Sequence, residues 1–304
     1  MFFNLLLLFL GPPAFGRRYA TGLAGLLGPS AQSASVWPDG HPFASLGHWR
    51  PSPALILPTT LESIFVMDQL ILVLESSSRK TSVALIKNGH CWLVEESSLD
   101  AGDPAAELTI FVQKILQRAK CKGTDLAAIA VSKGPGSYTG LRIAYSTAKG
   151  LAFAWQRPLL ALDTLAALAY GAKWNQSLPK NSLLICLEDA RRGNAYAAIY
   201  NSQLKIIKSP FFVSLKELDL SIYQQEHRLY VLGYAAMNYQ ELMSQNKIEI
   251  DLLPLKAPSA RFFEQLAQNA YEKQAFAELA YSEPFYLRAP HLTKPKKNKF
   301  FSKK

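Results

Sequence analysis

The stretch "AIAVSKGPGSYTGLRIAYSTAKGLAFA", residues 128–154, decides the fold because a strand, a loop and a helix follow one another in it. Its apolar beginning predicts a buried strand, which Pro135 breaks. Gly136 permits a tight bend, and Ser137 or Thr139 can cap the first turn of a helix that runs to about Trp155. Such a unit is typical of an α/β protein.

The loop in this stretch does not match the two common phosphate-binding loops. A P-loop requires a Lys directly after its second glycine, but Leu141 follows Gly140, and Gly136 lies too close to Gly140. The dinucleotide fingerprint G-x-G-x-x-G is one residue shorter than "GPGSYTG". An anion nest at the helix start stays open, because the N–H groups of a first helical turn point outward.

The helix after the loop carries small residues at every fourth position, namely Gly140, Ala144, Ala148 and Ala152. They form a smooth stripe that another element can approach closely. Leu141 and Tyr145 flank this stripe. It either packs against the protein's own sheet or contacts a helix of a partner protein.

Further elements are expected as strands at 69–75, 81–87, 91–96 and 158–163, and as a helix at 104–120. Asn88-Gly89 lies between two apolar runs and predicts a two-residue hairpin turn. Pro104 suits the first helical position. Leu108, Phe111 and Ile115 follow helical spacing and predict the apolar side of that helix.

A weak internal repeat relates the two halves of the chain. Glu75 precedes Asn88 by 13 residues, and Glu188 precedes Asn201 by 13 residues. The same alignment matches Arg79 with Arg192 and Ile86 with Ile199. We therefore expect a duplicated α/β fold with two lobes of βββαβα type and a cleft between them, over residues 67–166 and 167–290.

The composition is that of a soluble globular protein: 304 residues, 49% hydrophobic and 18% charged, with a net charge of +10. The three cysteines fit neither a disulfide framework nor a zinc knuckle, and they indicate a reducing compartment. We expect a cytoplasmic protein that does not enter a membrane.

Both ends of the chain differ from the rest. Residues 1–66 open with "MFFNLLLLFL" and continue rich in Pro and Gly, without periodicity. We interpret them as an upstream extension outside the fold, with Met67 opening the functional protein; a cleaved export signal is the alternative. Residues 291–304 form a basic tail, which either binds nucleic acid or only aids solubility.

Few residues suggest catalysis. The histidines form no H-E-x-x-H or H-x-x-x-H pair, and no nucleophile elbow is present. Glu75 and Asp189 end their strands, where carboxylates either cap turns or hold a hydrated Mg²⁺. Arg191 and Arg192, at the second hairpin turn, are candidates for phosphate contact.

Four segments resemble one family, TsaB, also called YeaZ. They are "GPGSYTGLRIAYSTAKGLA", "LILVLESSSRKTSVALI", "LEDARRGNAYAAIY" and "EPFYLR", and the resemblance spans about residues 67–288. The matched signature includes Gly134, Pro135, Gly136, Ser137, Thr139, Arg142, Lys149 and Gly150. Glu75 departs from the family, which commonly has Asp at that position.

The resemblance implies a duplicated actin-like and Hsp70-like ATPase (RNase H-like) fold. It also implies a non-catalytic scaffold subunit that pairs with a TsaD-like catalytic subunit, joined by a TsaE-like ATPase. The complex forms N6-threonylcarbamoyladenosine next to the anticodon of tRNAs that read ANN codons, so tRNA contact is indirect. A homodimer of the free subunit is an open alternative.

By the same resemblance, the partner interface would use the helices at 104–120 and 139–155. Its expected residues are Leu108, Phe111, Ile115, Gly140, Leu141, Ala144, Tyr145, Ala148 and Ala152. No cofactor of its own is implied, although ATP or ADP is possible at the level of the complex. The alternative is an active nucleotide-dependent kinase or hydrolase that uses Glu75 and Asp189.

Overall fold

The first of two sheets contains the strand that opens the decisive stretch. The computed structural model describes residues 68–99, 103–175, 177–243 and 249–289, so the expected extension 1–66 and tail 291–304 lie outside the described residues. The strand order is β3-β2-β1-β4-β5, formed by β1 (Leu70–Glu75), β2 (Ser82–Lys87), β3 (His90–Glu96), β4 (Ala128–Gly134) and β5 (Leu159–Asp163). Strands β1, β2 and β3 are antiparallel, whereas β4 and β5 run parallel to β1.

The second sheet repeats this order along the chain. It reads β8-β7-β6-β9-β10, formed by β6 (Ser182–Asp189), β7 (Asn194–Asn201), β8 (Ile206–Ser214), β9 (Arg228–Leu232) and β10 (Asp251–Leu252). As in the first sheet, an antiparallel three-stranded unit is followed by two parallel strands. The expected duplicated α/β fold is confirmed by this shared topology.

The residue-by-residue alignment of the repeat is wrong for the second strand of each lobe, β2 and β7. Glu75 pairs with Ser82, whereas Glu188 pairs with Tyr196, so the second connection is one residue longer. A one-residue shift moves side chains to the other face of a strand. Ile86 accordingly packs on the face of the first sheet that α7 covers, and Ile199 packs on the opposite face of the second sheet, with α6.

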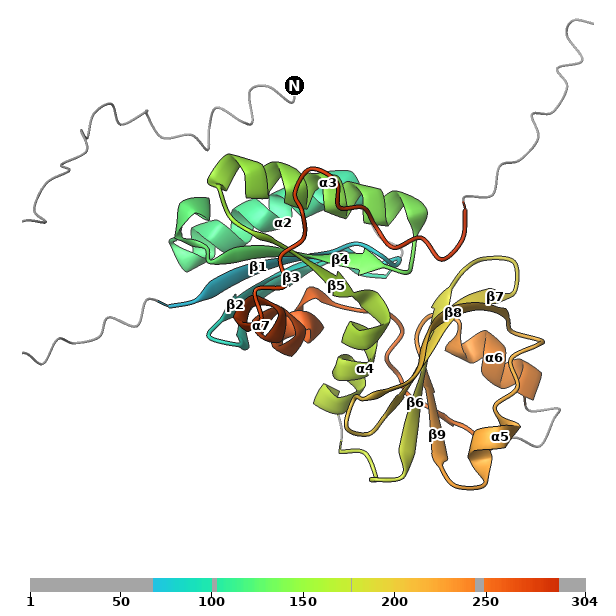
Figure 1. The fold of residues 1–304 in the computed structure, drawn as a ribbon. Coiled ribbons are helices and arrows are strands. Elements are labelled where there is room, and N and C mark those ends of the chain that lie inside the picture. The colour runs from blue at the N-terminus through green and yellow to red at the C-terminus, as the bar shows by residue number, and fades with distance from the viewer. Residues whose placement is uncertain (1–67, 100–102, 176, 244–248, 290–304) are drawn as a thin grey trace, which may run out of the picture. The chain divides into compact units, whose positions relative to one another are not determined.

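Two long helices cover one face of the first sheet, α2 (Pro104–Ala119) and α3 (Tyr138–Trp155) (Figure 1). Both begin where expected, because a polar side chain caps each of them. Asp103 Oδ1 accepts a hydrogen bond from the Ala105 N–H at 3.0 Å, and Ser137 Oγ accepts one from the Gly140 N–H at 3.3 Å.

Other helices complete the lobes. α4 (Thr164–Asn175) contacts β4 in the first sheet and β6 and β7 in the second. Among the described residues, the helices on the other face of the second sheet are the short α5 (Ser221–Gln224) and α6 (Ala236–Met243). No helix in the described ranges is both long and apolar enough to cross a membrane.

The chain returns to the first sheet after it leaves the second. The 3₁₀ helix η2 (Ala260–Phe263) and α7 (Glu264–Glu272) pack on the face opposite α2 and α3 (Figure 1). The expected lobes, 67–166 and 167–290, follow the order of the chain and do not include this return. The first lobe in space therefore contains a segment from near the end of the described chain.

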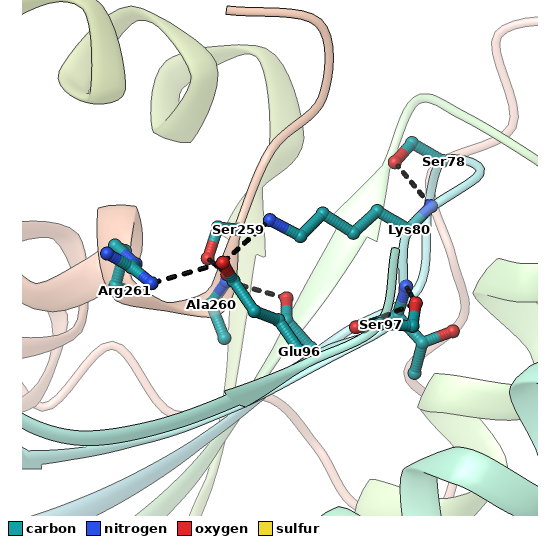
Figure 2. Close-up of polar contacts among 9 residues, drawn as sticks. Ser78, Lys80, Glu96, Ser97, Ser259, Ala260 and Arg261 are labelled. Carbon is teal, nitrogen blue, oxygen red and sulfur yellow. Dashed lines mark hydrogen bonds and ion pairs between the residues drawn. The ribbon is translucent and has the colours of Figure 1, made fainter. Parts of the chain in front are cut away.

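A polar network fastens this return segment to β3. Figure 2 shows Glu96 accepting a hydrogen bond from Ser259 Oγ at 2.8 Å and contacting the Arg261 guanidinium at 3.1 Å and Lys80 Nζ at 2.9 Å. The backbone N–H of Ala260 also donates to Ser82 Oγ at 2.8 Å. One carboxylate thus joins β3 and the β1–β2 loop to a return segment that lies more than 160 residues further along the chain.

Candidate functional site

A cavity of about 360 Å³ is lined by residues of both lobes, and we call it the interlobe cavity. The first lobe supplies residues from the β1–β2 loop and from the loop before α3. The second lobe supplies the end of β6 and the turn into β7, and the segment 285–289 completes the lining. The lining thus combines loops and a helix start of the first lobe with strand ends and a hairpin turn of the second lobe.

The decisive stretch contributes part of the cavity wall. Pro135, Gly136, Ser137 and Thr139 all line it, in agreement with a loop that faces a cleft. Gly136 allows the close approach of the two loops, since a Cβ at this position would lie 2.3 Å from the Ser77 carbonyl oxygen. The backbone N–H of Ser137 donates to that same oxygen at 2.6 Å.

Other signature residues hold the C-terminal segment against α3. Arg142 Nε donates to the Tyr286 hydroxyl at 3.3 Å, and the Tyr286 ring packs on Tyr138 with centroids 5.0 Å apart. Lys149 Nζ donates to the carbonyl oxygens of Ala280 and Ser282 at 3.0 and 3.1 Å. The family signature therefore fixes a segment more than a hundred residues away in the chain, a role that its local pattern did not reveal.

Two buried carboxyl groups lie at the ends of the central strands. Glu75 is fully buried and Glu188 is 3% exposed. Burial raises the pKa of Glu75 to about 6, although hydrogen bonds from the Ser77 N–H and hydroxyl oppose the shift. Burial also raises the pKa of Glu188 well above its usual range, and the charge of Glu75 adds to this shift.

The two acids proposed for magnesium do not act together at the cavity. Asp189 lines it, but its carboxylate lies 3.7 Å from the Arg79 guanidinium and 3.9 Å from that of Arg191. Glu75 is buried and does not line the cavity, whereas the buried Glu188 does line it. Within the described residues, no group of three or more His, Cys, Asp or Glu side chains is placed to hold a metal ion.

The expected interface residues on the two long helices are mostly buried in the first lobe itself. Phe111 is half-buried, and the others pack in the lobe's core: Leu108, Ile115, Gly140, Leu141, Ala144, Tyr145, Ala148 and Ala152. The stripe of small residues lets α3 approach its own sheet, where a Cβ added at Gly140 would lie 1.8 Å from the Ser76 carbonyl oxygen. The assignment of these side chains to a partner surface is therefore corrected, and a bulky residue at Ala148 would disturb the core.

The opposite side of the same helices is exposed. Phe153 on α3 is 77% exposed, and Ile110 on α2 is 47% exposed. Ser146 and Gly150 are also exposed, and a Cβ at Gly150 would meet nothing within 4 Å. We call Ile110, Ser146, Gly150 and Phe153 the outer face of the helix pair. The spacing of residues in the sequence alone did not show which side of α3 is exposed and which side is buried.

Comparison with known proteins places these features in a family. The chain matches the family model TsaD, described as tRNA N6-adenosine threonylcarbamoyltransferase, over residues 103–295, which is more than half of its length. A relative from Haemophilus influenzae, named tRNA threonylcarbamoyladenosine biosynthesis protein TsaB, is 26% identical over 229 residues, which cover 72% of this chain and 93% of the relative. The protein of the same name from Escherichia coli is 32% identical over 130 residues, which cover 43% of this chain and about half, 54%, of the relative.

Solved structures show the same likeness. YeaZ from Pseudomonas aeruginosa matches with a TM-score of 0.60 at 28% identity, over 72% of this chain and 100% of that one. A second structure, described as an uncharacterized protein with similarity to peptidase YeaZ from the same organism, matches with a TM-score of 0.64 at the same identity and coverage.

Proposed function

Because this chain belongs to the TsaB (YeaZ) family, a branch of the tRNA N6-adenosine threonylcarbamoyltransferase family, we propose that it is a non-catalytic scaffold subunit in threonylcarbamoyladenosine synthesis. Its partner is a TsaD-like catalytic subunit. The complex modifies the adenosine next to the anticodon of tRNAs that read ANN codons. This chain supports the reaction by binding the partner and contributes no catalytic side chain.

The outer face of the helix pair carries this proposal. Large apolar side chains are costly to leave in water, and exposed groups of them mark interaction surfaces. Phe153 leaves 77% of its surface in solvent although it lies on a helix whose other side is fully packed. Beside it, Gly150 and Ser146 are small enough to let a second helix approach closely.

The proposal moves the interface from the buried stripe to the outer face while keeping the same two helices. α2 and α3 pack on the sheet through their buried residues, so the sheet holds the outer face rigid. A preformed face lowers the entropy cost of association. A TsaE-like ATPase would join the assembled pair, and a homodimer of the free subunit would use the same outer face.

The replacement Phe153→Asp tests the proposal. A charge at the centre of an apolar contact removes a buried aromatic anchor, and such anchors contribute about 2 kcal/mol or more, roughly thirtyfold in Kd. The measurement is the Kd for the TsaD-like partner by calorimetry, together with the Tm of the variant alone. We expect binding to weaken at least thirtyfold while the Tm stays close to that of the parent chain.

Ile222→Asp is the matched control. Ile222 is 73% exposed and lies on α5 of the second lobe, so it equals Phe153 in exposure and differs in location. We expect its affinity for the partner to be unchanged. Equal affinity of the Phe153→Asp variant and the parent chain would contradict the proposed interface.

A further inference from the structure

The chain passes over α3 after it leaves α7, and we call residues 277–286 of this passage the strap (Figure 1, red). Both ends of the strap are fixed to the first sheet. The Ala277 N–H donates to the Leu159 carbonyl oxygen of β5 at 2.8 Å. The Phe285 N–H donates to the Lys133 carbonyl oxygen of β4 at 2.6 Å. The strap is therefore anchored to the sheet on both sides of its passage over α3.

Lys149 of α3 holds the middle of the strap. Its ammonium group donates to the carbonyl oxygens of Ala280 and Ser282 at 3.0 and 3.1 Å. The Ser282 N–H donates in turn to the Glu278 carbonyl oxygen at 2.9 Å and closes a turn. Hydrogen bonds from a charged donor are stronger than neutral ones. The backbone on both sides of Tyr281, inside this turn, is therefore fixed.

The Tyr281 side chain faces solvent although its backbone is fixed. It is 79% exposed, which is close to the 77% of Phe153, whereas Leu279 of the same turn packs against the core of the first lobe. A tyrosine ring combines a large apolar surface with a terminal hydroxyl group, and tyrosine is enriched at protein interfaces. A backbone fixed in advance lowers the entropy cost of burying such a ring against another protein.

The strap borders the outer face of the helix pair. Lys149 precedes Gly150 directly and Phe153 by four positions, so these side chains are neighbours on α3. Tyr281 therefore lies about the length of one lysine side chain away from the outer face. A protein surface that covers Phe153 reaches Tyr281 by continuing over the strap.

The strap and α2 lie on opposite sides of α3. α2 packs on β2 and β3, which form one edge of the first sheet, and the strap begins on β5, the strand at the other edge. The exposed side chain of Ile110 on α2 and that of Tyr281 on the strap thus flank the exposed side of α3. This arrangement gives the outer face a third element, which comes from near the end of the described chain.

We propose that the strap is a second recognition element for the TsaD-like partner, with Tyr281 as its anchor and Lys149 as the residue that positions it. This inference rests on the proposed scaffold function. The partner surface that fits is an apolar helix surface that packs on Phe153 and extends over the Tyr281 ring. Lys149, a residue of the family signature, acts on binding through the strap.

The replacement Tyr281→Ala in the full chain tests the anchor, with the Kd for the TsaD-like partner measured by calorimetry and the Tm measured on the variant alone. Loss of an aromatic anchor should weaken binding roughly tenfold or more at an unchanged Tm. Tyr281→Phe keeps the ring and should retain most of the affinity. Trp174→Ala is the matched control, because Trp174 is an aromatic residue that is 54% exposed on α4, outside the helix pair and the strap. Its affinity should equal that of the parent chain.

A double-mutant cycle tests the positioning role of Lys149. Lys149→Met keeps the apolar stem but removes both hydrogen bonds to the strap, and it should weaken binding about fivefold; Lys149→Arg keeps donors and should weaken it less. If Lys149 acts through the anchor, Lys149→Met should cause no further loss in the Tyr281→Ala background. Equal losses in both backgrounds would overturn the positioning role.

Phe153→Asp, measured in the same series, separates the strap from the scaffold function. Weakened binding in both Phe153→Asp and Tyr281→Ala supports one continuous surface. Weakened binding in Phe153→Asp with parent-like affinity in Tyr281→Ala would overturn the inference about the strap and leave the helix pair as the interface. Absence of partner binding by the parent chain would overturn both proposals.

Discussion

The two lobes share one sheet topology but differ in the helices on their outer sides. In the first lobe, α2 and α3 have 16 and 18 residues, whereas α5 and α6 of the second lobe have 4 and 8. Both lobes bury a glutamate at the end of the central strand, Glu75 and Glu188. Duplication therefore explains the sheets and the cavity between the lobes, and the long helices of the first lobe explain the partner surface.

The largest expected effect comes from the close contact of α3 with the first sheet. Gly140→Ala would place a Cβ 1.8 Å from the carbonyl oxygen of Ser76, the residue directly after β1, so the helix must move away from the end of that strand. Overpacking of this kind should lower the free energy of unfolding by about 3 kcal/mol. Urea denaturation followed by circular dichroism measures it.

Gly150→Ala on the same helix provides the control with the opposite sign. Its Cβ would meet nothing within 4 Å, and alanine is the better helix former. We expect a gain of about 0.5–1 kcal/mol. If both variants changed stability equally, the account of the small-residue stripe as a sheet contact would be wrong.

The buried glutamates give the next largest effect, through pH. The pKa of Glu75 is raised to about 6 in the folded chain from 4.5, so its contribution to stability is fully present below about pH 4.5 and is lost as the pH rises through 6. The replacement Glu75→Gln removes this loss of stability, because glutamine does not ionise. Above pH 7 we expect the variant to exceed the parent chain by up to about 2 kcal/mol, a gain that disappears toward pH 4.5.

Ser77→Ala sharpens the pH prediction. Ser77 Oγ donates to Glu75 Oε1 at 2.5 Å and stabilises the ionised carboxylate. Its loss should raise the pKa of the folded Glu75 further, so the decrease in stability still begins near pH 4.5 but becomes larger and continues to higher pH. Unfolding curves of the three proteins between pH 4.5 and pH 8 measure both effects. A Glu75→Gln difference that does not vary with pH would refute the assigned pKa shift.

A smaller effect is expected from the side-chain cap at the start of α2, a feature that the short helix α5 lacks. Asp103 caps α2 through its side chain, whereas no side-chain cap is present at Leu220 before α5. Asp103→Ala should lower the free energy of unfolding by about 1 kcal/mol, and Asp103→Asn should retain most of it. Thermal unfolding of the two variants compares them. Equal losses would show that the negative charge, and not the capping hydrogen bond, stabilises the helix.

Much of the fold could be predicted because its signals are local. Asn88-Gly89 adopts positive φ angles of 51° and 81° at the predicted hairpin turn, and Asp103 and Ser137 begin the two long helices as expected. The repeat failed at Ile86 and Ile199 because the two connections differ by one residue, and an ungapped alignment does not detect that.

The candidate sites were less predictable, since burial and long-range contacts decide them. Ala148 and Phe153 both belong to α3 and differ by five positions, but one is fully buried and the other is 77% exposed. Helical spacing shows that a stripe exists but not which side meets the sheet. Arg288 lines the cavity because Arg142 and Lys149 hold the preceding segment, a contact across more than a hundred residues.

The most direct test of the central claim is hydrogen exchange of the backbone amides, with and without the TsaD-like partner. If the partner binds the outer face of the first lobe, exchange should slow within 104–119 and 138–155 and stay unchanged in β8 and α5 of the second lobe. Protection confined to β8, α5 or the interlobe cavity, with α2 and α3 unaffected, would contradict the account.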